Sequence, residues 1–314
     1  MVHRIFPQMA ENTRFRMTLF SLRSMALAVI LSASFTFPAA LQAQRRRDAA
    51  SGDDSPRVVA TLADLDRLTL ELASPNDDIT RAAIDSLQVI DHPRIVPPLA
   101  GLLRSGRSDI VVDKALDALR GLGHESAIEV LTEFTNHRRA SARRRAFQAL
   151  SAIEDGRVAA IIERGLRDSD RSVRGVAALA LGEIGATSSL GTLFVALERN
   201  VIEAAIAIGK LGNAASIERF DGFLGNEPLG VMLSGYDEYL RRDDVPIEAK
   251  TAIVERLGET AGVMVRQFLQ NYLRWFPVRS RNRELLALRD LVNETIQTIP
   301  ETSTGTTIRN GAAQ

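Results

Sequence analysis

Hydrophobic positions along residues 83–224 follow two superimposed periods. The short period places apolar side chains three or four positions apart, as on one face of an α-helix. The long period is close to 31 residues and marks five copies of one unit. The marker residues, spaced 32, 31, 31 and 27 positions apart, are Leu87, Leu119, Leu150, Leu181 and Ile208. A repeat of this length with helical spacing inside each copy is typical of stacked helices.

The repeat involves whole columns of positions. Four positions before the markers stand Ala83, Ala115, Ala146, Ala177 and Ala204. Three positions after them stand Ile90, Leu122, Ile153, Ile184 and Leu211. Twelve positions after them stand Leu99, Leu131, Ile162, Leu193 and Phe220. The first columns fit one helix of each unit and the last column fits a second, so the sequence predicts an all-α fold, an α-solenoid of antiparallel helix pairs.

The fourth unit has the clearest helix boundaries. Asp170 is expected to cap a first helix over 172–184, and a second helix is expected over 188–199. Because Asn200 follows Arg199 almost without a loop, the fifth unit begins early and its first helix should be shorter or differently tilted.

One column of glycines is expected to end first helices. Gly123, Gly185 and Gly212 occupy the same position, where a left-handed residue closes a helix without a Cβ penalty. Asp91 and Glu154 stand at this position in the other two units. We therefore expect those two turns to close differently.

The sequence outside the repeats divides into further segments. Residues 58–73 suit an amphipathic capping helix, so the repeat domain is assigned to 58–225, beyond which the repeat register is lost. A helical C-terminal extension over 226–298, with one possible degenerate repeat, is expected to hold helices at about 228–241, 247–258, 260–276 and 281–298. Residues 44–57 are expected to be a disordered linker and 299–314 a disordered tail.

The N-terminal residues 1–43 have the features of a Sec-type signal peptide. Arg14, Arg16 and Arg23 precede an apolar run over 25–37, and a small residue, Ala43, stands at the expected cleavage point. The run is shorter than the ~20 residues needed to span a bilayer. We therefore expect a periplasmic or secreted protein without stable membrane insertion after cleavage; the alternative is an uncleaved anchor, and Met17 is an alternative start.

Composition narrows the function classes. Of 314 residues, 25% are charged and 45% hydrophobic, the formal net charge is zero, and cysteine is absent. The absence of cysteine excludes disulfides and thiolate chemistry. Cleavage after residue 43 would leave a mildly acidic chain without aromatic residues among its basic ones, so nucleic acid is not an expected partner. His92, His124 and His137 fall in different units, and no phosphate loop or nucleophile motif occurs, so we expect no metal, no cofactor and no catalysis.

The segment from Asp168 to Gly185, DSDRSVRGVAALALGEIG, resembles the HEAT-like repeat in the version first associated with phycobilisome lyases. That repeat typically has an Asp, a Val-Arg pair, an Ala-Ala pair and a Leu-Gly pair, which here are Asp168, Val173-Arg174, Ala177-Ala178 and Leu181-Gly182. The resemblance extends by pattern over about 75–225. It implies an armadillo/HEAT-like superhelix and, for most members, a binding scaffold; some members are lyases or isomerases acting on bilins, an activity that repeat similarity does not transfer.

The sequence departs from the family in its charged ladder. HEAT repeats commonly stack an Asp and an Arg between units. Here the Arg column reads Thr80, Val112, Arg143 and Arg174, and the Asp column reads Ser74, Gly106, His137 and Asp168. At most two rungs survive, so the apolar columns are expected to hold the stack together.

The resemblance implies that second helices line the concave side. A candidate binding groove on that side comprises Glu129, Glu133, Glu163, Arg164, Arg167, Phe194, Glu198 and Glu218. The first hypothesis is that these residues hold an extended partner segment, with Phe194 as an apolar anchor. The alternative is that the charged residues form ordinary solvated helix faces and Phe194 packs in the core.

Two other clusters also have two interpretations. The basic run 137–145 would either meet an anionic surface or pair with Asp113, Asp117 and other acidic residues of the preceding unit. The C-terminal aromatic residues would either pack the core or form a partner-binding surface. They are Tyr236, Tyr239, Tyr272, Trp275 and Phe276.

The sequence therefore favours an exported, non-catalytic scaffold that binds another protein or an extended peptide. The alternative is a ligand-binding or lyase-like enzyme with a cleft between the solenoid and residues 226–298. A third possibility is a membrane-tethered structural subunit.

Overall fold

The computed structural model describes residues 60–277 and 279–300, and its regular elements in this part of the chain are all helical. The α-helices are α2 (Leu65–Leu72), α3 (Asp77–Ile90), α4 (Val96–Arg104), α5 (Asp109–Leu122), α6 (Ile128–Phe134), α7 (Ala140–Leu150), α8 (Arg157–Gly165), α9 (Arg171–Glu183), α10 (Leu190–Glu198), α11 (Ala204–Leu211), α12 (Ala214–Asp221), α13 (Leu229–Arg241), α14 (Ile247–Thr260), α15 (Val263–Leu273) and α16 (Arg283–Thr298). Short 3₁₀ helices are η1 (Leu62–Asp64), η2 (Pro93–Ile95), η3 (Glu125–Ala127) and η4 (Thr187–Ser189). The expected signal peptide, the linker and all but the first two residues of the expected tail lie outside the described residues.

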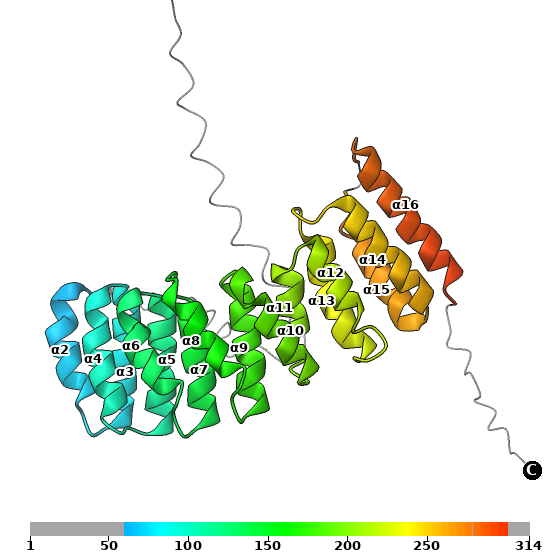
Figure 1. Ribbon diagram of the computed structural model, residues 1–314. Coiled ribbons are helices and arrows are strands. Elements are labelled where there is room, and N and C mark those ends of the chain that lie inside the picture. The colour runs from blue at the N-terminus through cyan, green and yellow to red at the C-terminus, as the bar shows by residue number, and fades with distance from the viewer. Residues whose placement is uncertain (1–59, 278, 301–314) are drawn as a thin grey trace, which may run out of the picture. The chain divides into compact units, whose positions relative to one another are not determined.

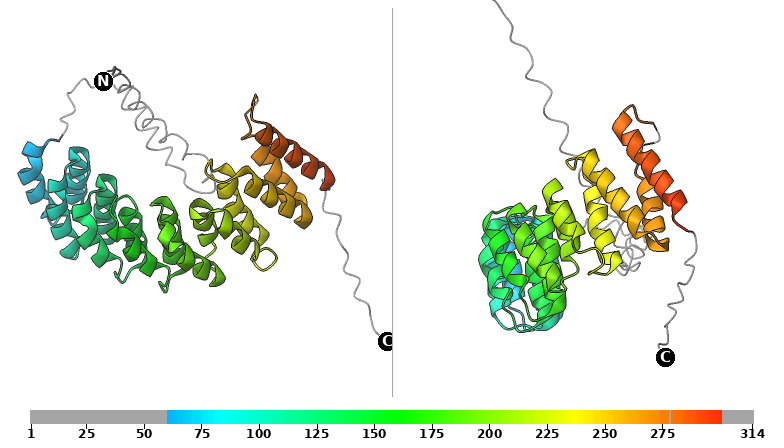
Figure 2. Two further views of the ribbon diagram at one scale, coloured as in Figure 1. Left: turned by 45° about the horizontal axis from the view of Figure 1, so that its top comes forward. Right: turned by 45° about the vertical axis from the view of Figure 1, so that its right-hand side comes forward.

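The helices stack in chain order, as Figures 1 and 2 show. First helices form a continuous row, in which α3, α5, α7, α9 and α11 each contact the next. Second helices pack against the first helix of the following unit, α4 on α5, α6 on α7, α8 on α9 and α10 on α11. This arrangement confirms the predicted all-α solenoid of helix pairs.

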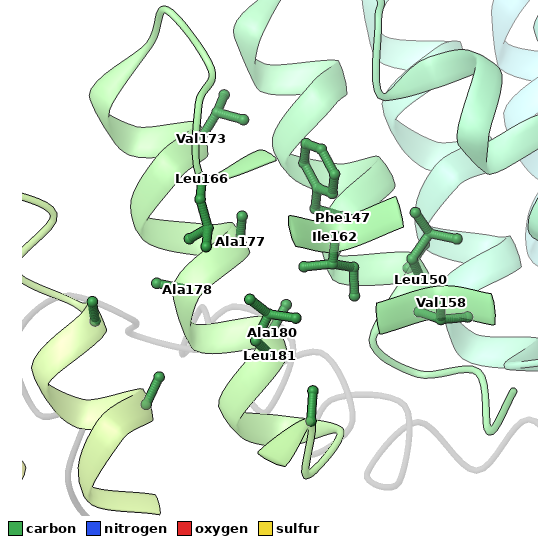
Figure 3. Packing of buried hydrophobic residues seen from close by; sticks show 14 of the residues in the cluster. Phe147, Leu150, Val158, Ile162, Leu166, Val173, Ala177, Ala178, Ala180 and Leu181 are labelled. Atoms are coloured by element: carbon green, nitrogen blue, oxygen red, sulfur yellow. The ribbon is translucent and has the colours of Figure 1, made fainter. Parts of the chain in front are cut away.

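The repeated apolar columns form the core of the stack. All five marker residues and all five alanines of the preceding column are fully buried. Figure 3 shows how neighbouring units meet: Phe147 of α7 and Ile162 of α8 face Ala177 of α9. Each buried leucine, isoleucine or phenylalanine of these columns contributes roughly 1.5–3 kcal/mol by burial.

The predicted boundaries of the fourth unit are confirmed within a few residues. Asp170 caps α9 because its Oδ1 accepts the backbone N–H groups of Ser172 at 2.9 Å and Val173 at 3.2 Å. The first helix of the fifth unit, α11, has only 8 residues, as the early start of that unit predicts.

The glycine column is confirmed at two of its three positions. Gly123 (φ 60°) and Gly185 (φ 69°) are left-handed. Gly212 is extended instead, with φ −70° and ψ 152°. Glycine is needed there for space, since a Cβ would lie 2.0 Å from the hydroxyl of Tyr239. The expectation for Asp91 is wrong: it adopts the same left-handed geometry (φ 44°) that glycine has elsewhere.

Stacking continues past Gly225, where the repeat register is lost. Helix α13 packs against α11, and α15 contacts α13. The α11–α13 contact is very close because both sides carry glycine: a Cβ on Gly209 would lie 2.2 Å from the carbonyl oxygen of Gly235. The helices expected near 228–241, 247–258, 260–276 and 281–298 correspond to α13, α14, α15 and α16.

Candidate partner-binding face

The charged ladder of the family is reduced here, as the sequence columns predict. One rung is present: the guanidinium of Arg143 donates from Nε and Nη2 to the two carboxylate oxygens of Asp168 in the next unit, both at 2.7 Å. Arg174 donates to the backbone carbonyl of Asp168 at 2.8 Å. In the first unit Arg107, outside the expected column, donates to the hydroxyl of Thr80 at 2.7 Å.

The basic run 137–145 is largely neutralised inside the stack. Arg139 Nη2 lies 2.8 Å from a carboxylate oxygen of Asp113, and Arg145 Nη1 lies 2.6 Å from one of Asp117. Lys114 in turn pairs with Asp85 at 2.5 Å. The second interpretation of the run is therefore confirmed for these residues: the run ties α7 to the acidic side of α5.

The three histidines of the repeat region close turns. The Nδ1 atoms of His92, His124 and His137 each accept a backbone N–H from the residue two positions later, at 3.1 Å. Each histidine thus accepts the backbone hydrogen bond that an aspartate or asparagine side chain usually accepts in such a turn. Among the described residues, no three or more His, Asp or Glu side chains come together as a metal site would require.

We call the exposed side of α4, α6, α8, α10 and α12 the second-helix face. Its first part centres on Arg104 of α4. The guanidinium Nε of Arg104 donates to Glu133 Oε2 at 2.9 Å, and its Nη2 lies 3.7 Å from Glu129. The bond from Arg104 lowers the pKa of the Glu133 carboxyl below its ordinary value. The Glu129 side chain is 87% exposed, so its charge is available to a partner.

Beside this ion pair, an open hollow of about 380 Å³ lies between α4 and α6. Its lining includes Pro93, Pro97, Ala100 and Val130, with Arg104 and Glu129 among its charged residues. A second hollow of about 430 Å³ shares Ser126 and Glu129 with the first and extends to Arg157 of α8. The two hollows adjoin at Ser126 and Glu129, and we call them together the groove. Residues at α4 and α6 line it, Arg157 at the start of α8 borders it, and its lining combines apolar surface with both signs of charge.

Pro93, Pro97 and Arg104 of the groove were not among the residues predicted from the sequence. The sequence did contain a signal for Pro97. It is one of two consecutive prolines at the start of a second helix, and prolines there expose rigid apolar surface without backbone N–H donors. The groove depends on which residues two neighbouring units bring together, and single-column reasoning did not combine α4 with α6.

The other candidate residues have different surroundings. Glu163 is half-buried, and Arg164, Arg167, Glu198 and Glu218 are exposed. Glu198 lies 3.6 Å from Arg219 of α12. Phe194 is only 2% exposed, so it packs in the core and is not a free anchor. Two neighbouring side chains cover its ring. The ring of Phe223 stacks on it with 6.0 Å between the ring centres, and the guanidinium of Arg219 lies over it, 4.2 Å from the ring centre.

The C-terminal aromatic residues serve mainly as core. Tyr236 and Tyr239 are fully buried; Tyr236 donates to Asp221 at 2.6 Å, and the Tyr239 hydroxyl lies 2.9 Å from that of Ser216. Burial raises the pKa of Tyr239 to about 12. Trp275 differs, since it is 57% exposed and carries the Arg241 guanidinium 4.1 Å above its ring.

The enzyme alternative requires a cleft between the solenoid and residues 226–298. Helices α11 and α13 meet there through Gly209 and Gly235, and Tyr236 and Tyr239 lie in the core beneath them. The contact between these two helices is tight, whereas the groove lies over α4, α6 and the start of α8.

Within 60–277 and 279–300, no helix combines the length and apolarity needed to cross a bilayer.

Residues 65–151 match the family model of HEAT repeats. This match confirms the resemblance inferred from the sequence, although the model covers the first units and the quoted motif lies in the fourth. No curated protein matches the chain.

Solved structures with a similar arrangement are repeat proteins and enzymes. The complex of CpcE and CpcF of phycocyanin lyase from Nostoc sp. PCC7120 matches with 19% identity and a TM-score of 0.41, over 74% of this chain and 94% of that chain. Human deoxyhypusine hydroxylase in complex with glycerol matches with 15% identity and a TM-score of 0.38, over 75% and 96% of the two chains. A designed armadillo repeat protein has 15% identity and a TM-score of 0.34, over 74% and 99%. At these values the similarities carry no information on chemistry.

Proposed function

We propose that this protein is a non-catalytic scaffold whose second-helix face binds an extended segment of another protein. The observation that carries the proposal is the groove, two adjoining open hollows at α4 and α6 that reach Arg157 at the start of α8. A peptide in extended conformation matches such a surface because successive units present successive contacts. Substrate-binding sites of enzymes are instead usually enclosed and bury most of a small ligand.

The charges of the groove favour a partner that presents a basic side chain. Glu129 is 87% exposed and makes only a long contact, at 3.7 Å, with Arg104, so it can accept a basic group, while Arg104 is already bound by Glu133. Pro97 and Val130 add apolar contact area. Hydrophobic contact flanked by charges is the usual composition of a specific protein interface.

The test is crosslinking in intact cells followed by recovery of the tagged full-length chain. Glu129→Lys should weaken recovery of the crosslinked partner, because the lysine would repel a basic group that the glutamate attracts. The side chain at this position is 87% exposed, so the substitution should leave the fold intact. Glu133→Lys is a less clean variant, since it also removes the bond from Arg104. Glu255→Lys is the matched control: the same charge change at an exposed residue of α14, outside the groove. Equal recovery with Glu129→Lys and Glu255→Lys would contradict the proposal.

We also propose that the scaffold works outside the cytoplasm, on the basis of the basic lead and apolar run in residues 14–43. Mass spectrometry of the protein purified from its native cells should find a mature N-terminus at Gln44. An intact N-terminus would contradict cleavage of a signal peptide and favour the membrane-tethered alternative.

A further inference from the structure

A smaller hollow of about 230 Å³ lies further along the second-helix face, where α8 and α10 end. Its lining residues are Leu166, Arg167, Thr192, Val195, Ala196 and Arg199. Leu166 and Ala196 belong to the core, whereas Val195 is 38% exposed. Arg167 and Arg199 are exposed. The hollow thus joins a small apolar surface to two cationic side chains.

Arg167 and Arg199 have no ion-pair partner among the described residues. Neither guanidinium makes a hydrogen bond or an ion pair with residues 60–277 or 279–300. By contrast, Arg104, Arg139 and Arg143 are each bound to carboxylates. Both arginines directly follow or nearly follow the end of a helix, where the negative end of the helix dipole stabilises a cation. Two exposed cations without a carboxylate partner in the described chain therefore border the hollow.

Nearby carboxylates do not neutralise this pair of charges. Glu198, the residue before Arg199, lies 3.6 Å from Arg219 of α12 instead. Glu163 of α8 is half-buried and forms no ion pair within the described chain. Arg164, in the last turn of α8, adds a third exposed cation on the same helix end. The α8–α10 hollow is thus electropositive, unlike the α4–α6 hollow, where Glu129 and Glu133 accompany Arg104.

We propose that the α8–α10 hollow binds an acidic side chain, aspartate or glutamate, of an extended protein segment, with an aliphatic neighbour of that side chain packed on Val195. The inference rests on the proposed function and names the chemistry of the partner at one place on the face. Guanidinium groups suit carboxylates because they present several N–H donors in a plane, and two of them can share one carboxylate. The exposed valine adds apolar contact beside the charge, which distinguishes a peptide from a free anion.

The experiment selects peptides from a degenerate library with the full-length protein and with two double variants. Arg167→Glu/Arg199→Glu reverses the charge of the hollow. Arg120→Glu/Arg138→Glu makes the same change at two exposed arginines without ion-pair partners among the described residues, on α5 and on the turn before α7. All four positions are on the surface, and circular dichroism with thermal unfolding verifies that both variants fold.

The wild-type protein and the control variant should select peptides with Asp or Glu beside Leu, Ile or Val. A selected peptide should bind the Arg167→Glu/Arg199→Glu variant about tenfold or more weakly, because repulsion replaces attraction. Its binding to the wild type should also weaken as salt is raised, since exposed charges are screened.

Three results would overturn the inference. These are selection without an excess of acidic residues, equal binding to the wild type and the Arg167→Glu/Arg199→Glu variant, and displacement of the peptide by inorganic phosphate at the concentration of the peptide itself. None of them removes the proposed function, which depends on the response to Glu129→Lys. Loss of that response alone would instead remove the scaffold proposal while peptide binding at the hollow persisted.

Discussion

Asp168 joins two neighbouring units through a single carboxylate. Both oxygens accept hydrogen bonds from Arg143, and Oδ1 also accepts the backbone N–H of Asp170 at 2.8 Å. The side chains of the pair are only 13% and 11% exposed. Burial alone would raise the pKa of the Asp168 carboxyl, but the bonds from Arg143 and Asp170 outweigh it, so the pKa is lowered.

Asp168→Asn should therefore destabilise the protein by about 2 kcal/mol at neutral pH, because Arg143 loses its charged partner. An aspartate with a depressed pKa stabilises the folded state above the unfolded pKa, and this contribution is lost as pH falls through the folded pKa. The difference between variant and wild type should accordingly shrink below about pH 3.8. Urea unfolding across this pH range measures it; a constant difference would show that the charge of Asp168 is not responsible.

The left-handed turn residues allow a reciprocal pair of substitutions. Asp91 adopts φ 44°, a conformation that costs a residue with a Cβ some free energy, whereas Gly185 adopts φ 69° in open space. Asp91→Gly should raise the free energy of unfolding by about 0.5–1 kcal/mol, and Gly185→Ala should lower it by about 1 kcal/mol. Thermal unfolding checks both. The same direction of change for both variants would refute the conformational explanation.

At the scale of elements, the contact between α11 and α13 carries the stack beyond the regular repeats. A Cβ on Gly235 would lie 2.4 Å from Cζ of Phe220 and 2.7 Å from the carbonyl oxygen of Ala205. Both partners are held in place, since Phe220 is fully buried and the carbonyl belongs to the backbone of α11. This position therefore has no room for a side chain.

Gly235→Ala should lower the free energy of unfolding by about 3 kcal/mol through overpacking. Gly230→Ala is the control in the same helix: it is exposed, and the nearest atom to its Cβ would be Met264 Sδ at 4.0 Å. That variant should be neutral or more stable by about 0.5 kcal/mol, because alanine favours helix. Similar losses in chemical unfolding for both variants would mean that the close approach of α11 and α13 is unimportant.

The helices were predictable because their periodicity is long and consistent. Residues such as Leu181 and Ala177 recur at fixed offsets, so the pattern located α3 to α10, and Asp170 located the start of α9. The exceptions are local. Asp91 takes a glycine conformation, which residue type alone does not favour, and Gly212 is glycine because Tyr239, 27 positions later, occupies the adjacent space.

The candidate face was less predictable than the helices. The second helices indicated its charged residues, and Glu129 is exposed as the groove hypothesis requires. Phe194 faces the core because Arg219 and Phe223 of the following unit cover it. The hollows at Pro97 and at Arg199 depend on how neighbouring helices are spaced, and the sequence pattern does not encode that spacing directly.

At the scale of the whole molecule, each unit contacts mainly its neighbours, so a local defect should stay local. Leu119→Ala in α5 removes a fully buried side chain and should cost about 2–5 kcal/mol. Amide hydrogen exchange should accelerate in α3, α5 and α7, while α13 to α16 keep their protection. Equal acceleration along the entire chain would contradict a stack of locally coupled units and indicate one cooperative core.

The same linear arrangement gives the molecule two distinct sides to its stack, and the account assigns partner binding to one of them. Site-specific photo-crosslinking in living cells tests this most directly. A photoreactive residue is placed in turn at Glu129, Arg164 and Glu218 on second helices and at Gln88 and Arg120 on first helices, all of them exposed. If a partner binds the second-helix face, the second-helix positions should crosslink to one partner protein and the first-helix positions should not. Crosslinks from Gln88 and Arg120 with none from Glu129 would contradict it.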